Sequence, residues 1–126
     1  MSIKAIKPNK AINLTVLRGE CSAGAEVREL DSGRRLATVP LRVRRGAEPA
    51  TSVPVTVWDP PAWLEAVDAG DELVVLGRVR RRFFQTASGL GAKVEVEAYV
   101  IAKGTDRRRL GSVLRRAHSQ LEALME

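Results

Sequence analysis

The sequence has little of the residue types that catalysis and metal binding require. Its 126 residues include one cysteine, Cys21, and one histidine, His118. A structural zinc site needs about four such ligands, and no histidine lies near Cys21 in the sequence to activate the thiol. A phosphate-binding loop of the GxxxxGK[ST] type is also absent. We therefore expect no enzyme activity, no metal, no cofactor and no small-molecule substrate, with His118 solvated and Cys21 a core or surface thiol.

Long apolar runs are absent as well. None approaches the roughly 18 residues that a membrane span needs, and the opening residues 1–4 (MSIK) lack the apolar segment of a secretory signal. A single cysteine cannot form an internal disulfide, which fits a reducing compartment. We expect a cytoplasmic, nucleoid-associated protein with no membrane partner.

Acidic residues are few relative to basic ones. Lys and Arg total 21 and Asp and Glu total 15, which gives a formal net charge of +6. Such an excess favours a polyanionic partner, either nucleic acid or an anionic membrane. Aromatic residues are scarce too: the whole chain has two Trp, two Phe and one Tyr.

Four arginines lie within residues 77–84 (GRVRRRFF), at the end of an apolar run. In a strand, Arg78, Arg80, Arg82 and Phe84 share one face, because side chains alternate. Cations that hold phosphates beside an aromatic ring that stacks on a base are what single-stranded nucleic acid binding requires. An edge strand protected by charge is the alternative. Phe83 faces the other side, and we predict that it lies in the core.

Alternating apolar residues predict five main strands and one short helix. The predicted strands are 12–18 extended by 24–30, then 35–45, 53–58, 71–84 and 92–102; the helix is 62–67 and a turn covers 85–91. This order is that of the OB-fold, a small Greek-key barrel that binds oligonucleotides. The predicted fold class is therefore all-β: a five-stranded OB-fold barrel over 11–104, with a short helix between strands three and four, plus a C-terminal helix.

Three local features accompany this prediction. Asp59 precedes two prolines and is expected to cap the short helix. Pro40 and Pro54 each remove a backbone donor from a strand, which argues for edge positions or bulges. Trp63, in the short helix, is expected to pack in the core or at an interface.

The two ends of the chain differ from its middle. Residues 1–10 contain three lysines and no acid, and we expect a basic arm. Residues 105–126 are predicted to form an amphipathic helix. Its apolar seam has the heptad spacing 4, 3, 4, 3 and consists of Leu110, Leu114, Ala117, Leu121 and Leu124. The helix docks on its own barrel or on another subunit, and the spacing slightly favours another subunit; the basic stretch 107–109 is expected to reach nucleic-acid phosphates.

Residues 13–103 resemble the bacterial single-stranded DNA-binding protein family, in seven short pieces in the right order. The pieces are 13–19 (NLTVLRG); 26–28 (EVR); Ser32-Gly33 with Leu36, Ala37 and Leu41; 55–58 (VTVW); 69–71 (AGD) with Leu73, Val75, Gly77 and Val79; Ser88-Gly89; and 94–96 (VEV). This resemblance implies an OB-fold that binds single-stranded DNA as a homo-oligomer, a tetramer or a dimer.

The resemblance also implies roles for individual residues. Trp58 and Phe84 fall at positions where the family has aromatics that stack on bases, and Arg80 and Arg82 fall where it has basic residues. The family's usual ending is an acidic C-terminal tip; from the predicted helix at 105–126 we expect no such tip here.

Two further stacking positions of the family carry no aromatic here. They fall near Ala47 and Ser52, so we expect weaker and more salt-dependent binding, with nearby arginines compensating through phosphate contacts. The residues expected to bind nucleic acid are Arg42, Arg44, Arg45, Trp58, Arg78, Arg80, Arg82, Phe84 and Lys93.

These observations predict a non-catalytic protein that binds single-stranded DNA in replication, recombination or repair, through arginine–phosphate contacts and aromatic stacking. Two alternatives remain open. One is an interaction adaptor in the manner of the primosomal replication proteins of the same fold. The other is an RNA-binding OB domain, since phosphates and stackable bases occur in both nucleic acids.

Overall fold

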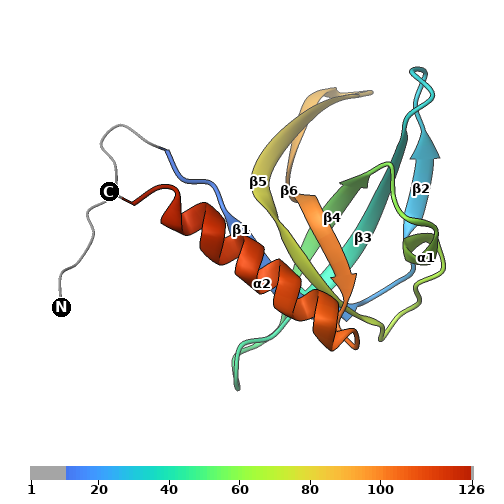
Figure 1. Cartoon of the computed structure of the whole chain (residues 1–126). Helices are drawn as coiled ribbons and strands as arrows, with labels where there is room; N and C mark the ends of the chain where they lie inside the picture. Colours follow the sequence, from blue (N-terminus) through green and yellow to red (C-terminus); the bar gives the residue numbers. More distant parts are fainter. Residues whose placement is uncertain (1–10, 126) are drawn as a thin grey trace, which may run out of the picture.

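The computed structural model describes residues 11–125, which contain six strands and two helices (Figure 1). The elements are β1 (Thr15–Cys21), β2 (Glu26–Glu29), β3 (Arg35–Val43), β4 (Thr51–Trp58), α1 (Ala62–Glu65), β5 (Glu72–Thr86), β6 (Gly89–Lys103) and α2 (Arg107–Glu122). The predicted basic arm and Glu126 lie outside the described residues.

The six strands form one sheet that closes on itself. Their order is β1-β5-β6-β4-β3-β2, and the end of β1 pairs back with β3 through Cys21 and Leu41. β4 and β6 meet in a short parallel contact at Val55–Val96 and Thr56–Glu97. The predicted OB-fold is confirmed, with α1 between the third and fourth predicted strands. The first predicted strand is two strands, because the chain leaves β1 after Cys21 and pairs again only from Glu26.

Two glycines allow backbones to approach where the barrel bends and closes. A Cβ atom on Gly19 would lie 2.2 Å from the carbonyl oxygen of Arg42, and one on Gly77 would lie 2.1 Å from that of Glu97. Gly77 also sits at the register shift of the β5–β6 ladder. A side chain at either position would push two strands apart, so these glycines are required by the closed sheet.

The barrel interior holds the residues that the alternation pattern placed there. Ala37, Val39 and Leu41 of β3 face Val55 and Val57 of β4, and all five are buried. Leu64 of α1 closes one end of this core, and Trp63 packs half-buried against it. Cys21 is also a core residue.

Pro40 and Pro54 oppose each other in the β3–β4 ladder. On its other side β3 pairs with β2 from Arg35 to Thr38 and with β1 at Leu41 and Arg42, so Pro40 falls in the gap where the neighbouring strand changes. β4 meets β6 only after Pro54. Neither proline therefore removes a ladder donor that a neighbouring strand would use, although β3 lies inside the sheet rather than at its edge.

The β5–β6 hairpin is longer than its sequence pattern indicates. Each strand has 15 residues, and the pairing continues to Thr86–Gly89. The turn therefore contains only residues 87 and 88, with Gly89 at φ 126°, instead of the predicted 85–91. The hairpin arches away from the barrel (Figure 1). Phe83 lies on this projecting part and is 59% exposed, so its predicted place in the core is wrong.

The start of α1 also differs from the prediction. Its N-cap is Pro61, which supplies no side-chain hydrogen bond. Asp59 instead adopts a left-handed backbone conformation at φ 48° and accepts hydrogen bonds from the side chain of Arg34 at 3.0 and 3.2 Å. Asp59 therefore holds the end of β4 against the β2–β3 turn, and α1 begins without a side-chain hydrogen bond at its N-cap.

Helix α2 packs against its own barrel. Asp106 caps it by accepting a hydrogen bond from the backbone N–H of Arg109 at 3.1 Å. Val113 and Ala117 are buried, and they pack against an apolar patch of the barrel that consists of Val74, Leu76 and Ala102, with Leu14, Val100 and Leu110 partly buried beside it.

The predicted heptad seam of α2 is therefore only partly correct. Leu114 and Leu121 remain 50% and 44% exposed, while Val113, which was not in the seam, is buried. The prediction that slightly favoured docking on another subunit is wrong for the face that contains Val113 and Ala117, because that face packs on the barrel of its own chain.

The close approach at Gly77 generates the first testable prediction. Gly77→Ala should lower the free energy of unfolding by about 1–3 kcal/mol, because the new methyl group meets backbone atoms that cannot move aside. Gly111→Ala is the matched control: its Cβ would meet only the flexible end of Arg115 at 3.2 Å, so the higher helix propensity of alanine should stabilise the protein by about 0.5–1 kcal/mol. Urea denaturation measures both values; equal effects of the two variants would contradict the steric argument.

Candidate nucleic-acid interface

The hairpin brings Arg78, Arg80 and Arg82 onto the outer surface of the sheet, while Arg81 lies on the opposite face. Across the ladder Arg78 lies opposite Glu97, Arg80 opposite Glu95, and Arg82 opposite Lys93. Alternation places these residues on one face of the hairpin. The face therefore carries acids as well as the cations found in the sequence analysis.

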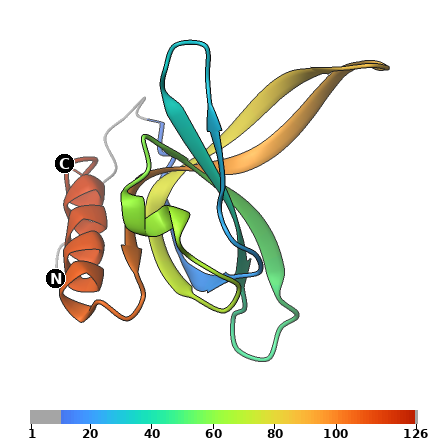
Figure 2. The ribbon, with the colours of Figure 1, turned by 90° about the vertical axis from the view of Figure 1, so that its right-hand side faces the viewer.

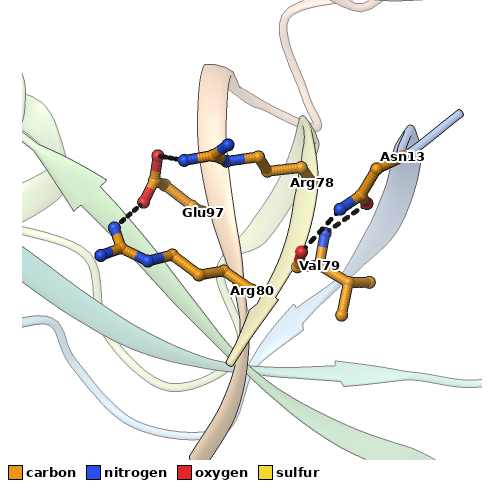
Figure 3. A network of polar contacts seen from close by, with 5 residues as sticks. All are labelled: Asn13, Arg78, Val79, Arg80 and Glu97. Carbon is orange, nitrogen blue, oxygen red and sulfur yellow. Dashed lines mark hydrogen bonds and ion pairs between the residues drawn. The ribbon is translucent and has the colours of Figure 1, made fainter. Parts of the chain in front are cut away.

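Glu97 lies between two arginines and binds both. Its carboxylate accepts hydrogen bonds from Arg80 at 2.5 Å and from Arg78 at 3.3 Å (Figure 3). Burial, the largest single influence, raises the pKa of Glu97, but the hydrogen bonds and charges of Arg80 and Arg78 together outweigh it and hold the pKa below its usual value. Glu97 is therefore ionised at neutral pH. The same contacts raise the pKa of Arg80.

Glu95 is the most deeply buried charged group of this face. It is 3% exposed, and its Oε1 lies 3.5 Å from Nε of Arg82. Neither Oε2 of Glu95 nor Nε of Arg82 has a hydrogen-bond partner among the described residues. A buried carboxylate with an unsatisfied oxygen is costly unless a nearby charge balances it, which ties Arg82 to this position.

These charged residues form one wall of a groove that also contains a tryptophan. Arg80, Arg82, Glu95 and Glu97 line it from β5 and β6, Trp58 lines it from the end of β4, and Arg28, Leu30, Leu36 and Thr56 complete it. The guanidinium of Arg34 lies 4.4 Å from the centroid of the Trp58 ring, which is the geometry of a cation–π contact. Trp58 is thus held in place on the outer surface.

Phe84 and Lys93 lie farther along the same face of the hairpin. Phe84 is opposite Gly91, where a Cβ atom would come within 2.6 Å of the Phe84 ring. The missing side chain of Gly91 therefore lets the ring lie across β6, as aromatic residues do beside glycines in paired strands. Lys93 is exposed opposite Arg82. Neither Phe84 nor Lys93 lines the groove that contains Trp58.

The remaining predicted arginines lie elsewhere on the barrel. Arg42 and Arg44 line a depression that also contains the Arg18–Glu72 ion pair, and Arg45 follows in the exposed β3–β4 loop. Figure 2 shows this loop at the bottom of the view and the tip of the β5–β6 hairpin at the upper right. Within residues 11–125, Arg42, Arg44 and Arg45 have no acid within ion-pair distance.

A side-chain contact fixes the base of the hairpin. Asn13 accepts a hydrogen bond from the backbone N–H of Val79 at 2.9 Å and donates one to the Val79 carbonyl at 2.8 Å (Figure 3). These two bonds continue the β1–β5 pairing beyond Thr15 through a side chain. They orient the strand that carries Arg78 and Arg80.

The groups considered for catalysis are not arranged for it. Burial, followed by the charge of Asp71, raises the pKa of the Cys21 thiol, and a protonated thiol is a poor nucleophile. His118 is exposed on α2, 3.9 Å from Glu122. Among residues 11–125 no group of three or more His, Cys, Asp or Glu could hold a metal ion. No described helix is long and apolar enough to cross a membrane.

Several groove residues were not predicted from the sequence. Glu95 and Glu97 alternate with apolar residues on β6, and Arg78, Arg80 and Arg82 alternate with other residues on β5. This pattern is a signal that acids of one strand form ion pairs with arginines of the other. Arg34 had no such signal, because its contact with Trp58 depends on how the β2–β3 turn folds over the end of β4.

No family model and no curated protein matches the sequence. The search of solved structures does find matches. Wild-type single-stranded DNA-binding protein from Thermus aquaticus is 22% identical with a TM-score of 0.62, and a deletion mutant of that protein is 23% identical with a TM-score of 0.63. The chain has the fold of a bacterial single-stranded DNA-binding protein. The matches cover 78% and 76% of this chain but only 43% and 42% of the Thermus chains, so it spans about two fifths of their length.

Proposed function

We propose that the protein binds single-stranded DNA without catalysis, along the outer face of the barrel. The observation that carries this proposal is the groove in which Trp58 lies beside Arg80 and Arg82. Aromatic surfaces that stack on bases and cations that hold phosphates are the two components of single-strand binding. The fold shared with the Thermus aquaticus protein, whose name states that it binds single-stranded DNA, supports the same function.

The proposed interface contains two kinds of cation. Arg42, Arg44 and Arg45 have no acidic partner in the described chain and are ready to bind phosphates. Arg78, Arg80 and Arg82 of the hairpin must exchange carboxylates for phosphates, because Glu97 and Glu95 already bind them. We propose that the interface consists of all nine residues predicted from the sequence, with Phe84 and Lys93 extending it along the hairpin. The other seven are Arg42, Arg44, Arg45, Trp58, Arg78, Arg80 and Arg82.

We further propose that the protein acts as a homo-oligomer in DNA replication, recombination or repair in the cytoplasm. The inner face of the hairpin supports self-association, because beyond the barrel it leaves Val79, Phe83, Leu90 and Val94 exposed. Several large apolar side chains exposed on one face are typical of an interaction surface, although Arg81 and Gln85 lie among them. Light scattering measures the mass in solution, and a monomer at all concentrations would exclude this assembly.

The function is tested by comparing nucleic acids of equal length. A labelled oligo-dT should bind more tightly than a duplex, because stacking on Trp58 requires unpaired bases. The logarithm of the affinity should fall linearly with the logarithm of salt concentration as phosphates release counterions. Fluorescence anisotropy measures both, and oligo-U in the same assay separates DNA binding from RNA binding. Equal affinity for single strand and duplex would leave only a non-specific basic surface.

Trp58 should contribute through stacking rather than charge. We expect Trp58→Ala to weaken oligo-dT binding by about 1–3 kcal/mol while the salt dependence stays nearly unchanged; Trp58→Phe should keep much of the affinity. In a Trp63→Phe background, the fluorescence that remains comes from Trp58 and should be quenched by DNA. Circular dichroism checks the fold of each variant. Wild-type affinity of a folded Trp58→Ala variant would exclude stacking at this position.

Glu97 should weaken DNA binding, because it competes with phosphates for Arg78 and Arg80. Glu97→Gln should therefore raise the affinity for oligo-dT by about two- to fivefold, as expected for the loss of a partly exposed ion pair. The matched control is Glu29→Gln, which changes the net charge equally at an exposed position of β2 outside the groove. Titrations at one salt concentration compare the two, and an equal gain for both variants would show that only net charge matters.

A further inference from the structure

A second cleft lies between α2 and the last part of β6, apart from the Trp58 groove. Arg108, Arg109 and Arg116 line it from the helix, and Ile101 and Ala102 line it from the strand. An adjoining hollow shares Ile101, Ala102 and Arg109 and adds Trp63 and Lys103. Figure 2 shows α2 on the side of the barrel away from the tip of the β5–β6 hairpin. No residue of the cleft belongs to the groove that contains Trp58.

The floor of this cleft includes the open edge of a strand. β6 pairs with β5 as far as Lys103, but on its other side it meets β4 only at Val96 and Glu97. In the part of the chain that the structure describes, the β6 backbone from 98 to 103 therefore has no strand partner on that side. An open edge offers N–H and C=O groups to an added strand.

The walls of the cleft are strongly basic. Arg108, Arg109, Arg116 and Lys103 contribute four positive charges, and one acid, Asp106, lies at the adjoining hollow, 4.0 Å from Arg109. The N-terminal end of α2, where Arg108 and Arg109 lie, adds the partial positive charge of the helix dipole. The apolar floor and the half-buried Trp63 complete an amphipathic surface. A ligand that fits it carries carboxylates together with apolar side chains.

We propose that this cleft binds an extended segment of a partner protein, in which acidic and apolar residues alternate, as an added strand on β6. Alternation suits the site because successive side chains of a strand point to opposite faces. One set would meet the arginines of α2, and the other would meet Ile101 and Trp63. A peptide is favoured over nucleic acid because only a peptide backbone matches the hydrogen-bonding groups of the strand edge. The proposal goes beyond DNA binding and does not depend on it.

The experiment uses the full chain and a fluorescein-labelled ten-residue peptide of alternating Asp and Ile. We expect saturable binding by anisotropy, and protection from hydrogen exchange for those amides of residues 98–103 that face away from β5. A block peptide with the same composition should bind at least about tenfold more weakly. Successive N–H groups of a strand point to opposite edges, so N-methylation of all Ile or of all Asp residues should weaken binding about tenfold in one of the two peptides. If the block peptide or both N-methylated peptides bind as well as the alternating peptide, strand addition is excluded.

Paired variants locate the site. Arg109→Ala/Arg116→Ala removes two charges from the cleft and should weaken peptide binding by about tenfold or more. Arg107→Ala/Arg115→Ala removes two charges from the same helix at positions that do not line the cleft, and it should bind the peptide nearly as well as the wild type. Equal losses for the two double variants would overturn the proposal. The first pair changes exposed residues of a capped helix, and circular dichroism checks that α2 still forms.

Oligo-dT tests the alternative occupant. The two double variants should lose equal affinity for DNA, and saturating oligo-dT should leave the peptide bound. Displacement of the peptide by DNA, or a DNA loss specific to Arg109→Ala/Arg116→Ala, would assign the cleft to the nucleic-acid interface and overturn the proposal. Loss of DNA binding by Trp58→Ala with unchanged peptide binding keeps the two functions distinguishable.

Discussion

The antiparallel pairing of β5 with β6 determines most of what this protein presents to its surroundings. Before the register shift at Leu76 and Gly77, counted along β5, the outer face of the β5–β6 pair is apolar and is covered by α2. After the shift, the same face carries arginines opposite glutamates and continues to Phe84. The shift is possible because Gly77 has no side chain to meet the carbonyl of Glu97. The β5–β6 ladder thus provides both the apolar patch on which α2 packs and the charged surface of the hairpin. A change in its register would disrupt both.

The strands could be predicted from the sequence because alternation and burial agree along the barrel. The hairpin could not be predicted in detail, since a turn over 85–91 pairs Phe84 with Ala92, whereas the structure pairs Phe84 with Gly91. A slip of one residue exchanges the two faces of a strand, which hides the contacts of Arg78 and Arg80 with Glu97. The prediction for Phe83 fails for a related reason: its side chain does point to the inner side, but beyond the end of the barrel, where it is 59% exposed.

The helix shows the limit of a periodic pattern. Leucines spaced 4, 3, 4, 3 describe a stripe, but a neighbouring stripe through Val113 and Ala117 has equally suitable spacing and smaller side chains. The barrel presents a small apolar patch around Leu76, and smaller residues allow the helix to approach it closely. Packing against that patch therefore decided which stripe is buried, and Leu114 and Leu121 remain at its margin. For the candidate site, the sequence likewise predicted a set of cations but not Glu95 and Glu97, the acids that three of them contact.

The acidic partners give the proposed interface a basis for selectivity. Arginines held by Glu97 and Glu95 lose less side-chain freedom when they meet a phosphate, but each new contact replaces an existing one, so the net electrostatic gain is small. A duplex offers phosphates and no unpaired bases, and it gains little from this part of the surface. In the proposed function a single strand adds stacking of unpaired bases on Trp58, whose ring already contacts Arg34. In this proposal, discrimination between the two comes from the aromatic ring. Arg42, Arg44 and Arg45, which have no acidic partner among residues 11–125, would supply salt-dependent affinity for either.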